Sequence, residues 1–104
     1  MKLDHIAINS ENIKESISWY KKNIGCKVIY EDESWGMIRS HNTVIAFVSS
    51  EQHKPHIAFK VDRIEDMPCD KGLVREHRDG SLYYYDTDPS GNIIEWIYWP
   101  DRSL

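Results

Sequence analysis

The chain has 104 residues, and its 13 lysine and arginine residues against 17 aspartate and glutamate residues give a formal net charge of -4. This length allows one domain with a single modest core, and the acidic balance lacks the basic field of a nucleic-acid-binding protein. The sequence has no apolar run of membrane-spanning length and no signal-peptide pattern at its start, so we expect a cytoplasmic protein without a membrane partner. The spacing of Cys26 and Cys69 fits neither a zinc site nor a redox pair, and we expect two reduced thiols.

The first half of the chain predicts a strand, a helix and three further strands. Residues 3–9 alternate so that His5, Ala7 and Asn9 share one face of a strand. A helix is then expected from an N-cap at Ser10 to the glycine at position 25, because its apolar residues recur at helical spacing. The three strands that follow are predicted over residues 26–31, 35–40 and 43–49.

The same pattern begins again after a polar segment at residues 50–55. Asp-His-Ile-Ala-Ile at residues 4–8 matches Pro-His-Ile-Ala-Phe at residues 55–59, and residues 43–48 match residues 92–97. Such self-similarity indicates a duplicated unit, so we predict one domain over residues 1–104 with βαβββ modules at residues 1–50 and 55–99. In the second module we expect a short, acidic, proline-interrupted helix over residues 63–69 and strands over residues 73–78, 81–86 and 92–99.

Glu95 is the anomaly in the last predicted strand. Ile93, Glu95 and Ile97 share one face of this strand, so the carboxylate projects between apolar neighbours. A buried charge needs a partner, a proton or a metal ion to offset its lost hydration. Glu95 is therefore a candidate metal ligand.

Under the repeat, His5 and His56 occupy the same place in the first strand of each module, and Ala46 and Glu95 the same place in the last. Pseudo-twofold packing would gather these four positions. Two imidazoles and a carboxylate suit Fe(II), Mn(II), Zn(II) or Ni(II), whereas Ala46 offers no ligand. We predict that His5, His56 and Glu95 bind one divalent metal ion. The alternative is a metal-free pocket in which the three side chains only form hydrogen bonds.

The sequence resembles the vicinal oxygen chelate superfamily, which includes glyoxalases, bleomycin-resistance proteins, fosfomycin-resistance enzymes and type I extradiol dioxygenases. The matching segments are residues 4–8, 19–25, 55–59 and 85–95. The resemblance implies an α+β fold of two βαβββ modules, in which a cup-shaped, mostly antiparallel sheet surrounds a divalent metal held by His5, His56 and Glu95.

Members that isomerise or epimerise usually have a fourth ligand or base at the position of Ala46. The resemblance therefore argues against glyoxalase I and epimerase activity, and favours the three-ligand type of the extradiol dioxygenases and fosfomycin-modifying enzymes.

Two further residues are candidates for a catalytic role. The spacing of Tyr85 from Glu95 is similar to that of a tyrosine next to the metal ligands of extradiol dioxygenases. His77 lies one place from the position of their acid/base histidine, and a shift of one residue would turn its side chain to the opposite face of a strand. Tyr85 could instead be a core residue.

Two classes of function follow from these observations. In the first, a metal-dependent enzyme chelates two neighbouring oxygens of a small substrate, and Tyr85 or His77 donates or accepts a proton. In the second, the protein binds or sequesters a small molecule without a metal, as the resemblance to bleomycin-resistance proteins allows. The candidate walls of that pocket are Trp35, Tyr83, Tyr85 and Trp99. We also expect a homodimer, because the strand edges of such small modules need covering.

Overall fold

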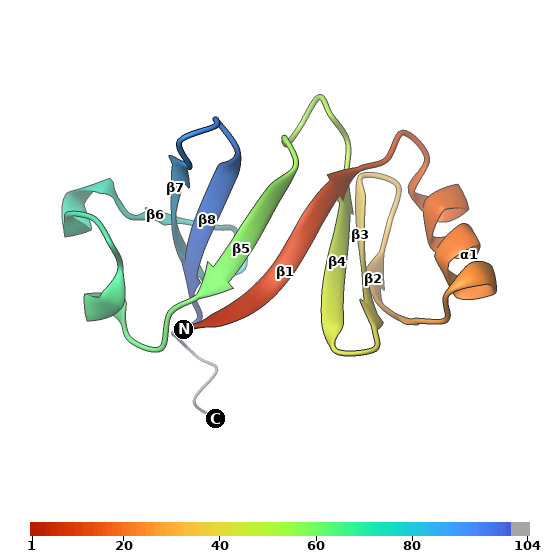
Figure 1. The fold of residues 1–104 in the computed structure, drawn as a ribbon, viewed down its shortest axis with the longest axis horizontal. Coiled ribbons are helices and arrows are strands. Elements are labelled where there is room, and N and C mark those ends of the chain that lie inside the picture. The colour runs from red at the N-terminus through yellow and green to blue at the C-terminus, as the bar shows by residue number, and fades with distance from the viewer. Residues whose placement is uncertain (101–104) are drawn as a thin grey trace. The chain divides into compact units, whose positions relative to one another are not determined.

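The computed structural model describes residues 1–100 of the chain (Figure 1). The elements of its first half are β1 (Lys2–Asn9), α1 (Ile13–Asn23), β2 (Lys27–Glu31), β3 (Trp35–Ser40) and β4 (Thr43–Val48). Those of its second half are β5 (His56–Lys60), the 3-10 turns η1 (Ile64–Asp66) and η2 (Lys71–Leu73), β6 (Arg75–Glu76), β7 (Leu82–Thr87) and β8 (Ile93–Tyr98). This order confirms the predicted α+β fold of two βαβββ modules, with 3-10 turns in place of the second helix.

The chain divides into two compact units that share strand β1. The N-terminal unit comprises residues 5–56, and the C-terminal unit comprises residues 1–4 together with the chain from Ile57 onward. In the N-terminal unit the strand order is β2-β3-β4-β1, with β1 parallel to β4 and the other pairs antiparallel. In the C-terminal unit the start of β1 is followed by β5, β8, β7 and β6, and the pairs β6–β7 and β7–β8 are antiparallel. The strand pairing is therefore mixed.

Helix α1 provides the core of the N-terminal unit. Its two buried residues, Ile13 and Ile17, pack against Ile38 of β3 and Phe47 of β4. The predicted N-cap was wrong: Asn12 caps the helix, and its side-chain oxygen accepts a hydrogen bond from the Glu15 backbone N–H at 3.0 Å. Asn12 is as good a cap as serine, so composition alone did not separate the two positions.

A second cluster lies on the opposite face of these strands. Ala7, Ala46 and Val48 are buried together, with Met37 packed against them. Because side chains alternate along a strand, His5 lies on the same face of β1 as Ala7. The helix thus covers one face of the N-terminal unit, and the first candidate ligand belongs to the other.

The helix expected over residues 63–69 is absent from the part of the chain that the structure describes. Only the single 3-10 turn Ile64–Asp66 forms there, and the backbone becomes extended at Met67, with φ -58° and ψ 128°. The cause is Pro68, because a proline ring disfavours the helical conformation of the residue before it.

The strand expected over residues 73–78 is also shorter than predicted. Turn η2 extends to Leu73, and His77 already begins the next turn, so that only Arg75–Glu76 remains as β6. The His77 N–H donates to the Ser81 carbonyl at 2.8 Å, and the Gly80 N–H donates to the His77 carbonyl at 3.0 Å. Gly80 has φ +92°, which only glycine adopts without strain.

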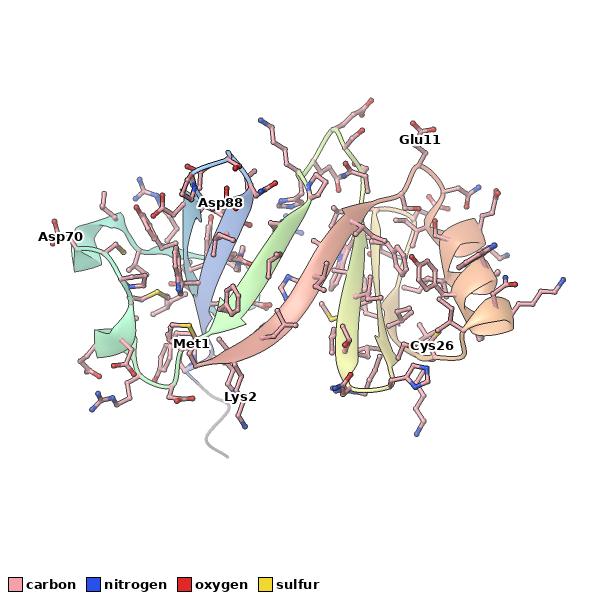
Figure 2. The ribbon with its side chains drawn as sticks, in the orientation of Figure 1. Met1, Lys2, Glu11, Cys26, Asp70 and Asp88 are labelled. Atoms are coloured by element: carbon pink, nitrogen blue, oxygen red, sulfur yellow. The ribbon has the colours of Figure 1, made fainter. Side chains whose placement is uncertain are left out.

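The hairpin of β7 and β8 carries Glu95 at its centre. Asp88 lies in the loop between the two strands (Figure 2) and accepts hydrogen bonds from the backbone N–H groups of Ser90 and Asn92. The loop fixes a register in which Tyr85 lies opposite Glu95 and Tyr83 opposite Ile97.

Cys26 and Cys69 are both free and half-buried. Within residues 1–100, no helix is long and apolar enough to cross a bilayer.

Candidate functional site

Two of the predicted ligands form a buried histidine pair in the N-terminal unit. His5 is on β1 and His56 is the first residue of β5, and their side chains are packed so that the residues are only 8% and 9% exposed. The ring centroids are 5.5 Å apart and the ring planes meet at 76°. The structure thus brings together the two histidines that the repeat placed in equivalent strands.

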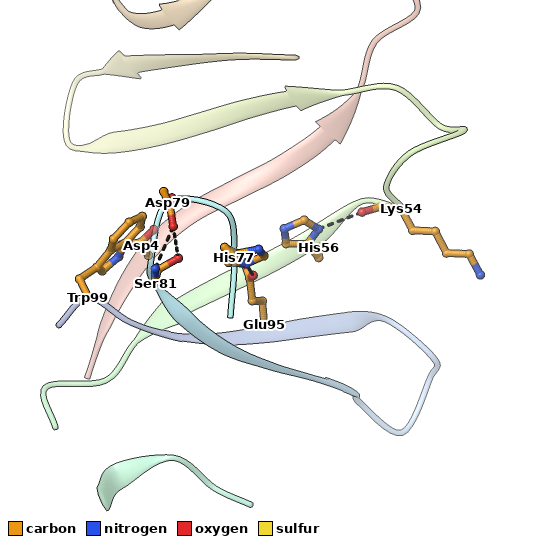
Figure 3. Close-up of polar contacts among 8 residues, drawn as sticks. All are labelled: Asp4, Lys54, His56, His77, Asp79, Ser81, Glu95 and Trp99. Atoms are coloured by element: carbon orange, nitrogen blue, oxygen red, sulfur yellow. Dashed lines mark hydrogen bonds and ion pairs between the residues drawn. The ribbon is translucent and has the colours of Figure 1, made fainter. Parts of the chain in front are cut away.

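The backbone fixes the orientation of the His56 ring. Its Nδ1 lies 2.9 Å from the carbonyl oxygen of Lys54, and a dashed line marks this contact in Figure 3. A carbonyl oxygen can only accept, so Nδ1 must carry the hydrogen, and in the neutral ring Nε2 then has the lone pair. Histidines that bind metals almost always donate their other ring N–H in this way. The tautomer of His56 is therefore the one that a metal ligand needs.

Glu95 of β8 is the buried carboxylate of the C-terminal unit. It is only 2% exposed, and its strand neighbour Ile97 is 3% exposed. Its Oε2 lies 2.8 Å from Nε2 of His77 (Figure 3). A carboxylate in such surroundings is retained only where hydrogen bonds and opposite charge compensate it, and His77 provides part of that compensation.

His77 is held on both its backbone and its ring. Two backbone hydrogen bonds close the turn that it begins, and its ring stacks on Tyr83 with a centroid distance of 3.7 Å and an angle of 15°. The sequence left the direction of this side chain open. Because His77 lies beyond the end of β6, the strand alternation that made its direction uncertain does not apply to it.

Tyr85 lies directly opposite Glu95 in the β7–β8 ladder and is 36% exposed. Burial, followed by the negative charge of Glu95 and a hydrogen bond to it, raises the pKa of Tyr85 well above that of a free tyrosine. Tyr85 consequently keeps its proton at neutral pH, and its ring meets that of Tyr83 edge-on at 5.1 Å. In this state the phenol O–H can donate a hydrogen bond.

The four predicted aromatic walls have different neighbours. Tyr83 and Tyr85 lie beside His77 and Glu95, as described above. Trp35 stacks on Tyr30 within the N-terminal unit at a centroid distance of 4.3 Å. Trp99 donates its indole N–H to Asp4 at 3.2 Å in the C-terminal unit.

Sequence reasoning missed two supporting contacts, the Lys54 carbonyl behind His56 and the pairing of His77 with Glu95. The only signal for the second contact was the Asp79-Gly80 turn, which redirects the chain after His77. The position equivalent to Glu95 in the first module, Ala46, is 4% exposed and packs against Ala7.

The chain matches the model of one known protein superfamily. The model of the Glyoxalase/Bleomycin resistance protein/Dioxygenase superfamily matches residues 2–68, which is more than half of the chain. No curated protein sequence matches the chain.

Solved structures with a similar fold include a methylmalonyl-CoA epimerase from Mycobacterium tuberculosis, with a TM-score of 0.75 and 15% identity, covering 98% of this chain and 90% of that one. A superfamily member from Vibrio splendidus 12B01 has a TM-score of 0.67 and 12% identity, with coverages of 91% and 97%. A methylmalonyl-CoA epimerase in complex with methylmalonyl-CoA and NH4+ has a TM-score of 0.69 and 16% identity, with coverages of 96% and 95%. At such identities, the similarity shows the fold alone.

Proposed function

Because the chain belongs to the glyoxalase/bleomycin resistance/dioxygenase superfamily, we propose that it is a divalent-metal-dependent enzyme acting on a small oxygenated substrate. In this proposal His5, His56 and Glu95 hold one ion of Fe(II), Mn(II), Zn(II) or Ni(II). The described residues contain this His/His/Glu group as a candidate set of metal ligands. The set suits all four ions and does not select among them.

The observation that carries the proposal is the tautomer of His56. Its Nδ1–H donates to the Lys54 carbonyl at 2.9 Å, which directs the lone pair to Nε2. The separation of the two histidine rings also fits a shared ion. With metal–nitrogen distances of about 2 Å, two imidazoles on one ion have ring centres about 5 Å apart, and the observed separation is 5.5 Å.

The burial of Glu95 supports the same set. A carboxylate that is 2% exposed has a direct use as the anionic ligand of a cation, and this use also offsets its lost hydration. In a pocket that binds its ligand by aromatic stacking alone, the same buried charge would have no use and would only lower the stability of the folded protein.

A divalent ion held by His5, His56 and Glu95 would supply Lewis-acid chemistry and would bind two neighbouring oxygens of the substrate. The chain supplies the proton-transfer groups. Tyr85 lies opposite Glu95 and bears an O–H group, and His77 is the second candidate for donating or accepting a proton. Oxidative ring cleavage of a catechol-like molecule and addition to a small oxygenated antibiotic both fit three ligands of this type.

The second candidate function is ligand binding without a metal, in the manner of the bleomycin-resistance proteins. The observation in its favour is the aromatic pair of Tyr83 and Tyr85, whose rings lie 5.1 Å apart on β7. Such a pair can stack on an apolar or cationic ligand.

Metal analysis of the purified protein, combined with Glu95→Gln, separates the two functions. In the enzyme, Glu95→Gln abolishes turnover and weakens metal binding, whereas in a binding protein ligand affinity stays nearly unchanged. Glu31→Gln, at an exposed position of β2, is the matched control and should leave both properties intact. The substrates to test are catechols, thiol adducts of 2-oxoaldehydes, and fosfomycin. Ligand binding that survives both metal removal and Glu95→Gln would overturn the enzyme proposal.

A further inference from the structure

The turn after β6 is built so that His77 has little freedom. Asp79 accepts hydrogen bonds from the Ser81 backbone N–H at 2.9 Å and from the Ser81 hydroxyl at 2.6 Å. Ser81 is 1% exposed, and its carbonyl accepts the His77 N–H. Hydrogen bonds therefore hold the turn on both sides of Gly80, and they also hold the backbone of His77.

The ring of His77 is fixed as well. Nearly parallel stacking on Tyr83, at 15°, sets the plane of the imidazole, and the contact of Nε2 with Oε2 of Glu95 sets its rotation within that plane. Together the two contacts hold the ring in an orientation in which its Nε2 lies against the carboxylate.

The chemistry of the contact sets the direction of the hydrogen bond. A carboxylate that binds a metal ion is ionised and only accepts hydrogen bonds, so in the proposed site Nε2 of His77 carries the hydrogen and donates it to Glu95. A nitrogen that donates to Glu95 has no lone pair with which to take a proton from a substrate. The contact instead restricts the rotation of the Glu95 side chain.

We propose that His77 is a positioning residue, which orients Glu95 as a metal ligand through its Nε2–H, and that Tyr83 keeps the imidazole in place for this task. The inference rests on the proposed metal site. Partners of this kind behind ligating carboxylates typically change metal affinity 10–100-fold when they are removed. Of the two candidate acid/base residues, the inference keeps Tyr85 for proton transfer, because Nε2 of His77 is engaged with Glu95.

The test compares Zn(II) affinity, measured by calorimetric titration of the metal-free protein, across four variants. His77→Phe keeps a ring for the stack on Tyr83 and removes the donor, while His77→Gln keeps an N–H donor of similar reach. Tyr83→Leu removes the stack and leaves His77 in place. His53→Phe makes the same chemical change at an exposed histidine and is the control. Thermal unfolding of each metal-free variant shows how much of any effect is loss of fold.

We expect His77→Phe to weaken Zn(II) binding about 10–100-fold, His77→Gln to restore most of the loss, Tyr83→Leu to have an intermediate effect, and His53→Phe to have none. A merely structural histidine would lower the unfolding temperature of the metal-free protein and leave the affinity unchanged, which overturns the inference. If His77→Phe does not fold, an unchanged Zn(II) affinity in a folded Tyr83→Leu variant decides against the inference. If the wild-type protein binds neither Zn(II) nor Mn(II), the proposed function itself is overturned. If it binds Zn(II) but substitution of His77 does not change the affinity, only the present inference is overturned.

Discussion

Helix α1 packs directly against Gly36 of β3, and replacing this glycine with alanine is a quantitative test of the packing. An added Cβ would lie 2.8 Å from Cγ2 of Ile13 and 2.8 Å from Cδ1 of Ile17, closer than real Cβ contacts. The Ile17 methyl ends a flexible side chain and can swing aside. The Ile13 methyl is attached at its own Cβ, so it moves only with a rotamer change or a shift of the helix.

Overpacking of this kind costs about 1–3 kcal/mol. Reduced freedom of the unfolded chain returns roughly 0.4–1 kcal/mol when glycine becomes alanine at an ordinary φ. We therefore expect Gly36→Ala to lower the free energy of unfolding by about 1–2 kcal/mol, which is a fall of roughly 5–10 °C in the unfolding temperature of a domain this size.

Urea and thermal unfolding followed by circular dichroism measure this change, with Gly72→Ala as the matched control. An added Cβ at Gly72 meets nothing within 4 Å, so this variant should be neutral or slightly stabilising. Ile17→Val removes one of the two crowded methyl groups, and it should therefore cost less in the Gly36→Ala background than alone. Equal stability of the two alanine variants, or an Ile17→Val cost that is the same in both backgrounds, would refute the described packing.

Three further predictions concern the helix cap, the β7–β8 loop and assembly. Asn12→Ala should lower the free energy of unfolding by about 1 kcal/mol in urea because the Glu15 N–H loses its acceptor, and a larger loss in Ser10→Ala would contradict the observed cap. The hydrogen bonds of Asp88 with Asn92 lower the pKa of that carboxyl, so its stabilisation is present above the unfolded pKa of about 4 and is lost as the pH falls toward the folded value. Asp88→Asn should therefore reduce the acid dependence of the unfolding temperature, and an unchanged pH profile would count against this loop. Light scattering at micromolar concentration should detect a homodimer, and a monomer would remove that expectation.

The sequence was sufficient for the first module, because its elements follow local rules. Alternation and helical spacing placed the strands and α1 within a few residues, and the strand over residues 35–40 has the predicted bounds. The Ser10 cap failed for a reason that only the fold shows. Its backbone N–H continues the pairing with β4 by donating to the Val48 carbonyl at 2.8 Å, so the chain is still extended there and the helix begins later.

The second module was predicted less well, because a proline shortens its helix and tertiary contacts set the surroundings of His77. Local composition favoured a helix before Pro68, but the proline stops it after a single 3-10 turn. His77 shows the same limit for the site. Its residue type marked it as a candidate, whereas its contact with Glu95 depends on a turn and a strand register that are separate in sequence.

The epimerases among the similar structures raise the question of whether this chain is one of them, and Ala46 bears on the answer. In the first module this position is the counterpart of Glu95, and the resemblance implies that isomerising members place a ligand or base there. In this chain Ala46 pairs with Ala7 of β1 and Met37 of β3, and it is buried in a cluster of small and apolar side chains. A carboxylate there would need room that the neighbouring side chains occupy. The two modules therefore share a backbone plan while only the second carries the carboxylate, as the proposed three-ligand set requires. Because one scaffold can carry different sites, the residue at position 46, and not the fold shared with the epimerases at 15–16% identity, bears on the chemistry.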